Sequence, residues 1–509
     1  MALLATFPLL LIVVLMLILH WPAARAGAVG LLAALVLALG VFGYGQRVYP
    51  QLGIPSAVGG ALIEALFTTA TILWIIGPAI CLYNLQKITG GIEVLRQSLG
   101  KISTDPKIAA LLVAWFFALF MEGAAGFGAP IALAAPFLVS AGFKPVQAVA
   151  LALIGHSVGV SFGAVGTPII PQVEATGLSG AELARATGIY HSLLGWVMLA
   201  ILVFLVTRTD RPENKGKSIW AWAAFAAVAF LVPFFIISRF VGPELPTLGG
   251  AFIGGTLFIG ATLLIRQRTE PREIVPTLET SGLSLLRAAG PYLALIGLVL
   301  LTRLFSPVRD LVFAVEWKWA LGDTFRGAFR PFYHPGTLLW LAFIAAVFCL
   351  RASRDQIHSA LGQTLKQLTT VTIALAAMLG LARIMVHSGM IELTAVAVAG
   401  IAGGAWPFFA PFIGVLGTFV TGSATTSNIL FTDFQQSAAQ NVGLPVDKIV
   451  GAQGFGAAVG NIICPHNIIA GGATVGLKGE EGVVLRKTLP ACLIYATLGG
   501  LLALLLASL

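Results

Sequence analysis

The chain has 509 residues, of which 58% are hydrophobic and only 10% are charged. Soluble domains carry about 45–50% apolar and about 25% charged residues, so this composition excludes a soluble globular protein, a disordered chain and a fibre. The net charge of +9 is typical of membrane proteins with basic cytoplasmic loops, and it does not indicate a nucleic-acid partner. The chain is expected to be an integral membrane protein with many spans.

The cysteines and the metal motifs narrow the class further. The four cysteines lie in apolar segments and form no CxxC pair, which excludes a disulfide framework and a zinc site. The sequence contains no HExxH motif either. We therefore expect a protein that is not an enzyme and that holds neither a metal ion nor a cofactor.

Apolar stretches long enough to cross a bilayer core of about 30 Å predict about twelve membrane-spanning helices. The first stretch lacks a basic region before it and is interpreted as a span rather than a signal peptide. The predicted spans lie near residues 5–22, 27–45, 56–85, 146–170, 188–207, 218–239, 246–265, 288–304, 336–350, 368–387, 446–470 and 488–507.

Basic residues gather in the loops 86–107, 208–217 and 266–287. The predicted spans place these loops on one side of the membrane, which the positive-inside rule identifies as the cytoplasm. Both termini are then expected outside. The loop 304–335 also falls outside, although it carries basic residues, and it is assigned no role.

Two further apolar stretches, 108–141 and 405–441, break in the middle at small or polar residues. They belong to an internal repeat. The first half contains GGIEVL at 90–95, FMEGAAGFGAP at 120–130 and GAVGTP at 163–168; the second contains GMIEL at 389–393, FVTGSATTSN at 419–428 and GNIICP at 460–465. Chance similarity between glycine-rich membrane segments is the alternative interpretation.

The predicted topology gives the two repeats, approximately 56–207 and 368–507, opposite orientations within a single transporter domain that covers residues 1–509. Inverted repeats with broken helices are typical of secondary transporters. Each broken stretch is then expected to be a re-entrant hairpin. Irregular backbone at the tip of such a hairpin is tolerated only where protein or a water-filled cavity covers it, so both tips indicate a binding cavity.

The tip of the first stretch combines one carboxyl group with small residues. Glycines let backbone N–H groups approach a ligand, and the N-terminus of the returning helix favours an anion. Burial among apolar side chains favours the protonated form of a carboxyl group, so Glu122 is a candidate proton carrier. A structural carboxylate bonded to backbone N–H groups is the alternative. The candidate residues at this tip are Glu122, Gly123, Ala124, Gly126 and Gly128.

The tip of the second stretch is rich in hydroxyl groups and also carries an amide. Such groups can donate hydrogen bonds to a carboxylate or to a substrate hydroxyl. Capping and packing of the helices is the alternative role. The candidate residues here are Thr421, Gly422, Ser423, Thr425, Ser427 and Asn428.

Ionisable residues inside a membrane are costly and are functional candidates by default. The additional candidates are His156 with its neighbour Ser157, Asn461 and His466 at the second glycine break, and Arg383 and Asp433. Glu122, His156, His466, Asp433 and Arg383 are the candidates for proton coupling, although buried histidines are also commonly structural and Arg383 can extend toward the membrane surface. A small, donor-rich site with few charges fits a monoanion that carries a hydroxyl group.

The segments LLVAWFFALFMEGAAGFGAPIALAAPFLVSAGFKP, FGAVGTPI, FIGVLGTFVTGSATTSNILF and VGNIICPHNIIA resemble the lactate permease family over most of the chain. The resemblance implies a symporter for a proton and a 2-hydroxy monocarboxylate (L-lactate, D-lactate or glycolate) in the plasma membrane of a prokaryote. It also suggests kinship with transporters that use paired re-entrant hairpins. The family pattern carries over best to Glu122, Gly123, Gly126, Gly128, Gly422, Ser423, Ser427 and Asn428.

The chain departs from the family pattern at four positions. Ala424 stands where the family usually has an acidic residue, and Asn461 stands where it has a lysine. His466 replaces a glutamine, and His156 replaces an asparagine. Hydroxyl and carbonyl oxygens also suit hard cations, so sodium-coupled transport of another small carboxylate stays open, as does a channel. The sequence does not set the oligomeric state.

Overall fold

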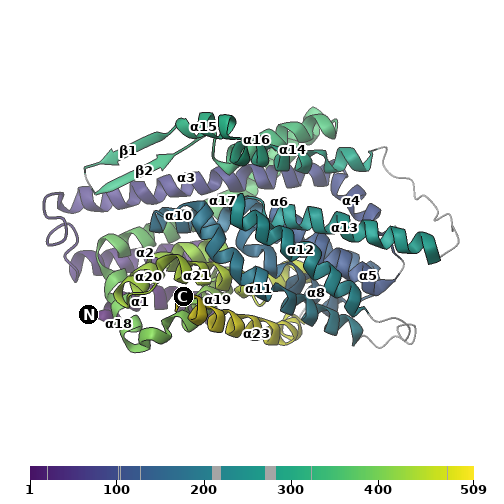
Figure 1. Cartoon of the computed structure of the whole chain (residues 1–509). Coiled ribbons are helices and arrows are strands. Elements are labelled where there is room, and N and C mark those ends of the chain that lie inside the picture. Colours follow the sequence, from purple (N-terminus) through teal and green to yellow (C-terminus); the bar gives the residue numbers. More distant parts are fainter. Residues whose placement is uncertain are drawn as a thin grey trace.

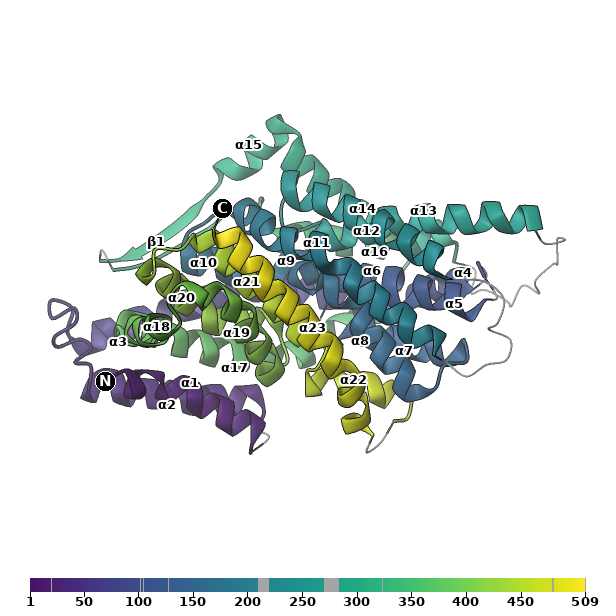
Figure 2. The ribbon, with the colours of Figure 1, turned by 60° about the horizontal axis from the view of Figure 1, so that its bottom comes forward.

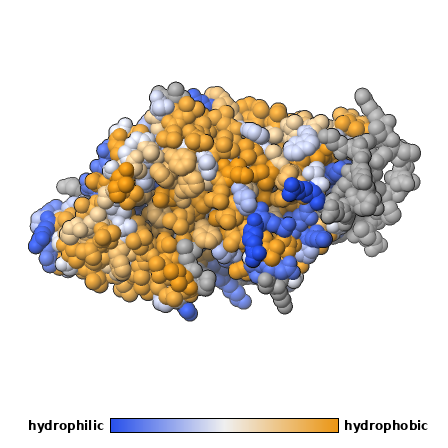
Figure 3. All heavy atoms as spheres, turned by 90° about the horizontal axis from the view of Figure 1, so that it is seen from below, coloured by the Kyte–Doolittle hydropathy of each residue, from blue (hydrophilic) through white to orange (hydrophobic). Residues whose placement is uncertain are grey.

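The computed structural model describes residues 1–19, 21–100, 102–103, 105–126, 128–208, 219–269, 283–322, 324–477 and 480–508. Within these ranges, eleven helical segments are long and apolar enough to cross a membrane. The expected all-α polytopic membrane protein is therefore confirmed. Figure 3 shows a face covered mostly by apolar side chains, with hydrophilic residues gathered toward its ends.

The N-terminal helices α1 (Ala2–Leu17) and α2 (Ala23–Gly40) pack on each other. They are followed by α3 (Gly53–Ile88), a helix of 36 residues that packs along the 34-residue helix α17 (Arg354–His387). Thirty-six residues span about 54 Å at 1.5 Å per residue. Both helices are thus longer than the bilayer core and extend beyond it.

The segment after α3 follows a definite order of elements. A short helix α4 (Gly91–Gly100) leads into a continuous helical rod made of α5 (Pro106–Ala110), a π-helix (Leu111–Phe117) and α6 (Ala118–Ala124). The chain then turns, and α7 (Ala129–Ser140) packs back against this rod. Helix α8 (Pro145–His156), a break, α10 (Ile170–Thr176) and α11 (Gly180–Thr207) complete the series.

The segment after α17 repeats this order. A short helix α18 (Met390–Ala402) leads into α19 (Trp406–Thr421), which pairs with the returning helix α20 (Ala424–Asn441). Helix α21 (Val446–Gly460), a break, α22 (Pro465–Thr474) and α23 (Glu481–Ala507) follow. Left-handed glycines, Gly90 and Gly389, precede the two short helices with φ of 79° and 77°.

The break after α8 falls where the sequence predicts it. Helix α8 passes into a 3₁₀ segment (Ser157–Phe162), and the backbone then turns left-handed at Ala164 and Val165, with φ of 42° and 56°. This region is costly for a β-branched residue. The equivalent break in the second series lies between Gly460 and Pro465, so the span expected at 446–470 is two helices rather than one.

The middle of the chain contributes two pairs of helices. They are α12 (Trp220–Phe240) with α13 (Pro246–Thr269), and α14 (Leu285–Leu304) with α16 (Pro335–Cys349). Helix α13 also packs against α6, which places the first pair beside the first hairpin. Figures 1 and 2 show α12, α13 and α14 in teal alongside α6 and α11.

The loop expected at 304–335 contains regular structure. A short helix α15 (Ser306–Ala314) precedes an antiparallel hairpin of β1 (Trp317–Leu321) and β2 (Phe325–Phe329), in which Trp319 pairs with Gly327. Figure 1 shows this hairpin lying along one end of α3. The backbone N–H of Arg326 donates to Glu64 Oε1 of α3 at 3.0 Å, which fastens the hairpin to the helix.

Candidate transport site

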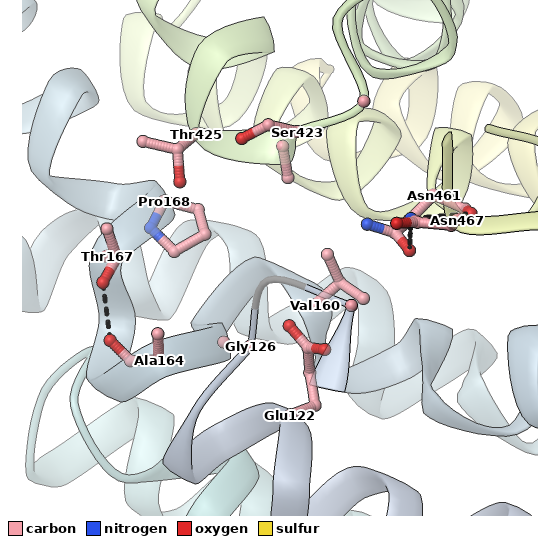
Figure 4. A pocket seen from close by; sticks show the side chains of 14 residues that line it. Glu122, Gly126, Val160, Ala164, Thr167, Pro168, Ser423, Thr425, Asn461 and Asn467 are labelled. Carbon is pink, nitrogen blue, oxygen red and sulfur yellow. Dashed lines mark hydrogen bonds between the residues drawn. The ribbon is translucent and has the colours of Figure 1, made fainter. Parts of the chain in front are cut away.

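A cavity of about 50 Å³ lies where the tips of the two helical hairpins meet the two helix breaks (Figure 4). A volume of this size holds a few water molecules. Its wall comes from four segments that are far apart in the sequence. The lining residues are Glu122, Gly126, Gly128, Val160, Gly163, Ala164, Thr167, Pro168, Gly422, Ser423, Ala424, Thr425, Asn461 and Asn467.

The first tip presents one carboxyl group to the cavity. Helix α6 ends just after Glu122, and Gly126 and Gly128 adopt left-handed φ of 59° and 81° in the turn to α7. The Glu122 side chain is buried, and it accepts no hydrogen bond from any residue within the described ranges. Its Oε1 lies directly against Gly163, where a Cβ atom would collide with it. The glycine at 163 therefore leaves the room that this carboxyl group occupies.

The second tip presents the N-terminus of an 18-residue helix. Helix α19 ends at Gly422, with φ of 81°, and Ser423 caps α20 by accepting a hydrogen bond from the Thr426 N–H at 3.3 Å. The first N–H groups of a helix have no partner inside the helix. Ser423, Ala424 and Thr425 all line the cavity, so the partial positive charge of this helix end faces it.

Hydrogen bonds fasten the second hairpin to the two breaks. Asn428 Nδ2 of α20 donates to the Pro168 carbonyl of the first break at 2.8 Å. Thr418 Oγ1 of α19 donates to the Ala457 carbonyl of α21 at 2.7 Å, just before the second break. At the first break, Thr167 Oγ1 donates to the Ala164 carbonyl at 2.6 Å. These bonds connect three of the four segments that form the cavity wall, namely the second hairpin and the two breaks.

Behind the wall, His156 is fully buried at the end of α8. Its Nδ1 donates to the Ala152 carbonyl at 2.7 Å, and its Nε2 lies 3.1 Å from Asn461 Oδ1. The same Asn461 oxygen accepts a hydrogen bond from Asn467 Nδ2 at 2.6 Å. His156 itself does not line the cavity; it is linked to the wall through Asn461, which bonds in turn to Asn467, and both amides are labelled in Figure 4.

The structure brings together part of the set proposed from the sequence. Seven of those residues line the cavity: Glu122, Gly126, Gly128, Gly422, Ser423, Thr425 and Asn461. Three other candidate hydroxyl groups near the cavity donate hydrogen bonds to backbone carbonyl groups. Ser157 donates to Ile154, Thr421 to Gly417 and Ser427 to Gly414, at 2.7, 2.7 and 2.9 Å respectively. Gly123 and Ala124 are buried in the last turn of α6.

The three remaining ionisable candidates do not line the cavity. His466 is exposed at the start of α22, although its Cβ lies beside the lining residue Gly422. Arg383 and Asp433 belong to a second group of ionisable residues around Glu64, whose Oε2 lies 2.7 Å from His387 Nε2. In this group Arg383 interacts electrostatically with Asp433 of α20.

Sequence reasoning missed seven lining residues, namely Val160, Gly163, Ala164, Thr167, Pro168, Ala424 and Asn467. The first five belong to the glycine break at 163–168 or the turn before it, so the break itself is the signal that could have found them. Asn467 directly follows His466 in the sequence.

The segment GHSVG at 155–159 matches the GxSxG pattern of nucleophilic serines. That pattern needs a sharp strand-to-helix turn with an exposed serine. Here Ser157 is fully buried where α8 passes into a 3₁₀ segment, and its hydroxyl donates to the Ile154 carbonyl. The match therefore reflects helix packing. The described part of the chain also brings together no group of three or more His, Cys, Asp or Glu side chains for a metal ion.

The arrangement of helices resembles that of two solved transporters. The YdaH transporter of Alcanivorax borkumensis has a TM-score of 0.50 at 14% identity, covering 94% of this chain and 97% of that one. MtrF of Neisseria gonorrhoeae has a TM-score of 0.51 at 15% identity and covers 95% of both chains. The chain therefore shares its polytopic helical fold with these two proteins.

A family model described as L-lactate permease matches residues 1–509. The glycolate permease GlcA of Escherichia coli K12 is 29% identical, over 99% of this chain and 95% of the relative. The L-lactate permease of Streptococcus iniae is 30% identical, over 87% of this chain and 92% of the relative. The chain belongs to the L-lactate permease family.

Proposed function

We propose that this permease imports a small 2-hydroxy monocarboxylate (L-lactate, D-lactate or glycolate) together with a proton across the cytoplasmic membrane. The observation that carries the proposal is the cavity between the two tips, where a carboxyl group and a helix N-terminus face one small space. The relatives described above are named as glycolate and L-lactate permeases, which supports this class of substrate.

The N-terminus of α20 is the proposed binding point for the substrate carboxylate. Backbone N–H groups at a helix start bind anions without a cationic side chain. The hydroxyl groups of Ser423 and Thr425 add further donors. The lining of the cavity, all within the described residues, contains neither lysine nor arginine. One negative charge on the substrate therefore suits this site better than two.

Glu122 is the proposed proton carrier. An ionised carboxylate in the same small cavity repels a substrate anion, and this repulsion is strong where water is scarce. A protonated Glu122 removes the repulsion and can donate a hydrogen bond to the substrate. Binding of the anion and binding of the proton then favour each other, which is the thermodynamic requirement for symport.

The two hairpins are proposed to be re-entrant and to belong to inverted repeats at approximately 56–207 and 368–507. The shared order of elements supports this: a long helix, a left-handed glycine, a short helix, a helical hairpin and a broken helix occur in both halves. Movement of the scaffold against this central site would alternately expose it to either side of the membrane.

The proposal is tested with Glu122→Gln in proteoliposomes. Glutamine keeps the size of the side chain but carries no exchangeable proton on a carboxyl group. We expect proton-driven accumulation of labelled lactate to be lost, while exchange of internal for external lactate continues. Glu93→Gln is the matched control, because Glu93 pairs with Arg96 on α4 at 2.6 Å and does not line the cavity. Unimpaired accumulation in Glu122→Gln refutes the role of Glu122.

A further inference from the structure

Two buried histidines in neighbouring helices have different hydrogen-bond environments. His191 of α11 lies 2.8 Å from Ser161 Oγ and 2.9 Å from Tyr495 Oη. The Ser161 hydroxyl donates to the Gly454 carbonyl, so it accepts from His191 Nε2–H, and Tyr495 donates to Nδ1. A neutral imidazole has one donor and one acceptor nitrogen. Both nitrogens of His191 are therefore satisfied without a charge.

His156 does not have such a pair of partners. The Ala152 carbonyl can only accept, so Nδ1 of His156 carries a hydrogen. Its other neighbour is the Asn461 amide oxygen, which also only accepts. With Asn461 oriented in this way, Nε2 must also carry a hydrogen, and the ring is a cation. A neutral ring requires Asn461 to turn its amide by half a turn and to donate to Nε2 instead.

The orientation of Asn461 determines what the cavity presents to a substrate. In the first orientation, Asn461 Oδ1 accepts from His156 and from Asn467 Nδ2. Asn461 Nδ2 then makes no hydrogen bond within the described residues, and it belongs to a side chain that lines the cavity. Asn467 Oδ1 lies toward Gly128, another lining residue. The cavity wall therefore presents one amide donor, Asn461 Nδ2, and one amide acceptor, Asn467 Oδ1.

In the second orientation, the pattern is reversed. Asn461 Nδ2 donates to the neutral His156 ring and to Asn467 Oδ1, after Asn467 has also turned. The Asn461 oxygen then faces the cavity, where it repels a carboxylate. The protonation state of His156 is thus transmitted to the cavity as the positions of a donor and an acceptor on Asn461 and Asn467.

We propose that the His156–Asn461–Asn467 chain recognises the 2-hydroxy acid and makes its binding depend on a proton at His156. This inference rests on the proposed function. With His156 protonated, Asn461 donates to the substrate carboxylate and Asn467 accepts from the 2-hydroxyl group. His156 is a positioning residue, because it acts on the substrate through Asn461.

Other ionisable groups lie on the helices packed against α8. Glu122 of α6 shares the cavity with Asn461, and His466 of α22 is exposed. His191 of α11 is bonded to Tyr495 of α23, a helix that also carries the buried Cys492. Further charged residues lie in the first two turns of α11 and α23. Because Glu122 also binds a proton in the proposed function, the test must count protons rather than detect their presence.

The test measures lactate affinity of the purified protein across about pH 5–8, the range in which histidines titrate. The slope of log Kd against pH gives the number of protons taken up with the anion. We expect His156→Gln to lower this slope by about one proton, and His191→Gln to leave it unchanged. An unaltered slope in His156→Gln overturns the inference and leaves the proposed function standing. A wild-type protein that binds neither lactate nor glycolate overturns the proposed function, and the inference with it.

A second measurement does not depend on the folding of the histidine variant. Propionate has the carbon skeleton of lactate without the 2-hydroxyl group. We expect Asn467→Ala to reduce the preference for lactate over propionate by about tenfold, which is the value of one hydrogen bond. Asn84→Ala is the matched control, since Asn84 is a buried asparagine that donates to Thr364 at 3.0 Å outside the cavity. An unchanged preference in Asn467→Ala overturns the role in recognition.

Discussion

Substitution of Gly163 by alanine is expected to displace the Glu122 carboxyl group while changing the stability of the fold only slightly. Gly163 has a φ of −64° and a ψ of 155°, which alanine adopts without strain. Its added Cβ would collide with Glu122 Oε1 and lie 3.1 and 3.5 Å from Glu122 Cδ and Cγ. No other heavy atom lies nearer than these three. The carboxyl group must therefore move, by roughly 1 Å, to restore ordinary contact.

Gly163→Ala is expected to have a small effect on the free energy of unfolding and a large effect on the rate of lactate uptake. The group that moves is the end of a flexible side chain beside a cavity, so the cost is at the low end of the about 1–3 kcal/mol of overpacking. The loss of unfolded-state entropy offsets about 0.4–1 kcal/mol of it. We expect the free energy of unfolding to change by about 1 kcal/mol or less. A misplacement of about 1 Å at a reacting group can cost about 10²-fold in rate, and we expect proton-driven lactate uptake to fall at least about tenfold.

The assay is initial lactate uptake per folded molecule in proteoliposomes, with thermal unfolding measured on the same preparation. Gly254→Ala is the control variant, with a large expected effect on stability and none on uptake per folded molecule. Its Cβ would lie 2.5 Å from the Ala229 carbonyl oxygen at the α12–α13 crossing, and backbone cannot move aside cheaply. This variant should lose about 1–3 kcal/mol of stability yet keep its uptake per folded molecule. Normal uptake by a normally stable Gly163→Ala protein would refute the reasoning.

Three further substitutions test separate contacts. Ala424→Asp places a carboxylate in the lining of the cavity, and the repulsion should weaken lactate binding at least about tenfold; equal or tighter binding contradicts an anion site there. Asn428→Ala removes the hydrogen bond to the Pro168 carbonyl. Denaturant titrations should show a free energy of unfolding lower by about 1–2 kcal/mol. An unchanged value would mean that this bond does not join the second hairpin to the first helix break. Glu64→Gln weakens the contact with His387 and keeps an acceptor for the Arg326 N–H. It should destabilise by about 1–2 kcal/mol without changing the Kd for lactate, and a weakened Kd would place this second ionisable group in the binding pathway.

The architecture could be predicted from the sequence because its determinants are local. Apolar length specifies the membrane helices, and the Gly-Thr-Pro and Cys-Pro sequences mark the helix breaks after α8 and α21, since proline removes a backbone donor. The turn between α19 and α20 follows from Gly422, the left-handed residue of that tip. The breaks and the turn lie where they were predicted, whereas eleven candidate spans stand in the described residues in place of the twelve expected, because the stretches near 5–22 and 336–350 form shorter helices and the span at 446–470 is divided.

The hairpin of β1 and β2 was missed, although its alternation of aromatic and other residues in WKWAL and FRGAF is a strand signal. Its site on α3 depends on Phe325 and on the bond between the Arg326 N–H and Glu64. Glu64 is 262 positions away in the sequence. Such pairing is a property of the tertiary structure, and no local pattern specifies it.

The cavity was only partly predictable for a similar reason. Composition identified Glu122 and the hydroxyl groups of the second tip, but not which of two neighbours faces inward after Pro465. In the structure Asn467 lines the cavity and His466 is exposed. His156 was selected as an ionisable residue inside a span. Its link to the cavity through Asn461, 305 positions later, emerges only when the two halves pack together.

The central claim is that a proton gradient drives uptake of a 2-hydroxy monocarboxylate. The most direct measurement uses proteoliposomes that contain the wild-type protein and labelled lactate or glycolate outside. One arm imposes an inward proton gradient at equal sodium, and the other an inward sodium gradient at equal pH. The account predicts accumulation above electrochemical equilibrium in the proton arm alone. Accumulation in the sodium arm alone, or uptake that never exceeds equilibrium in either arm, would contradict it.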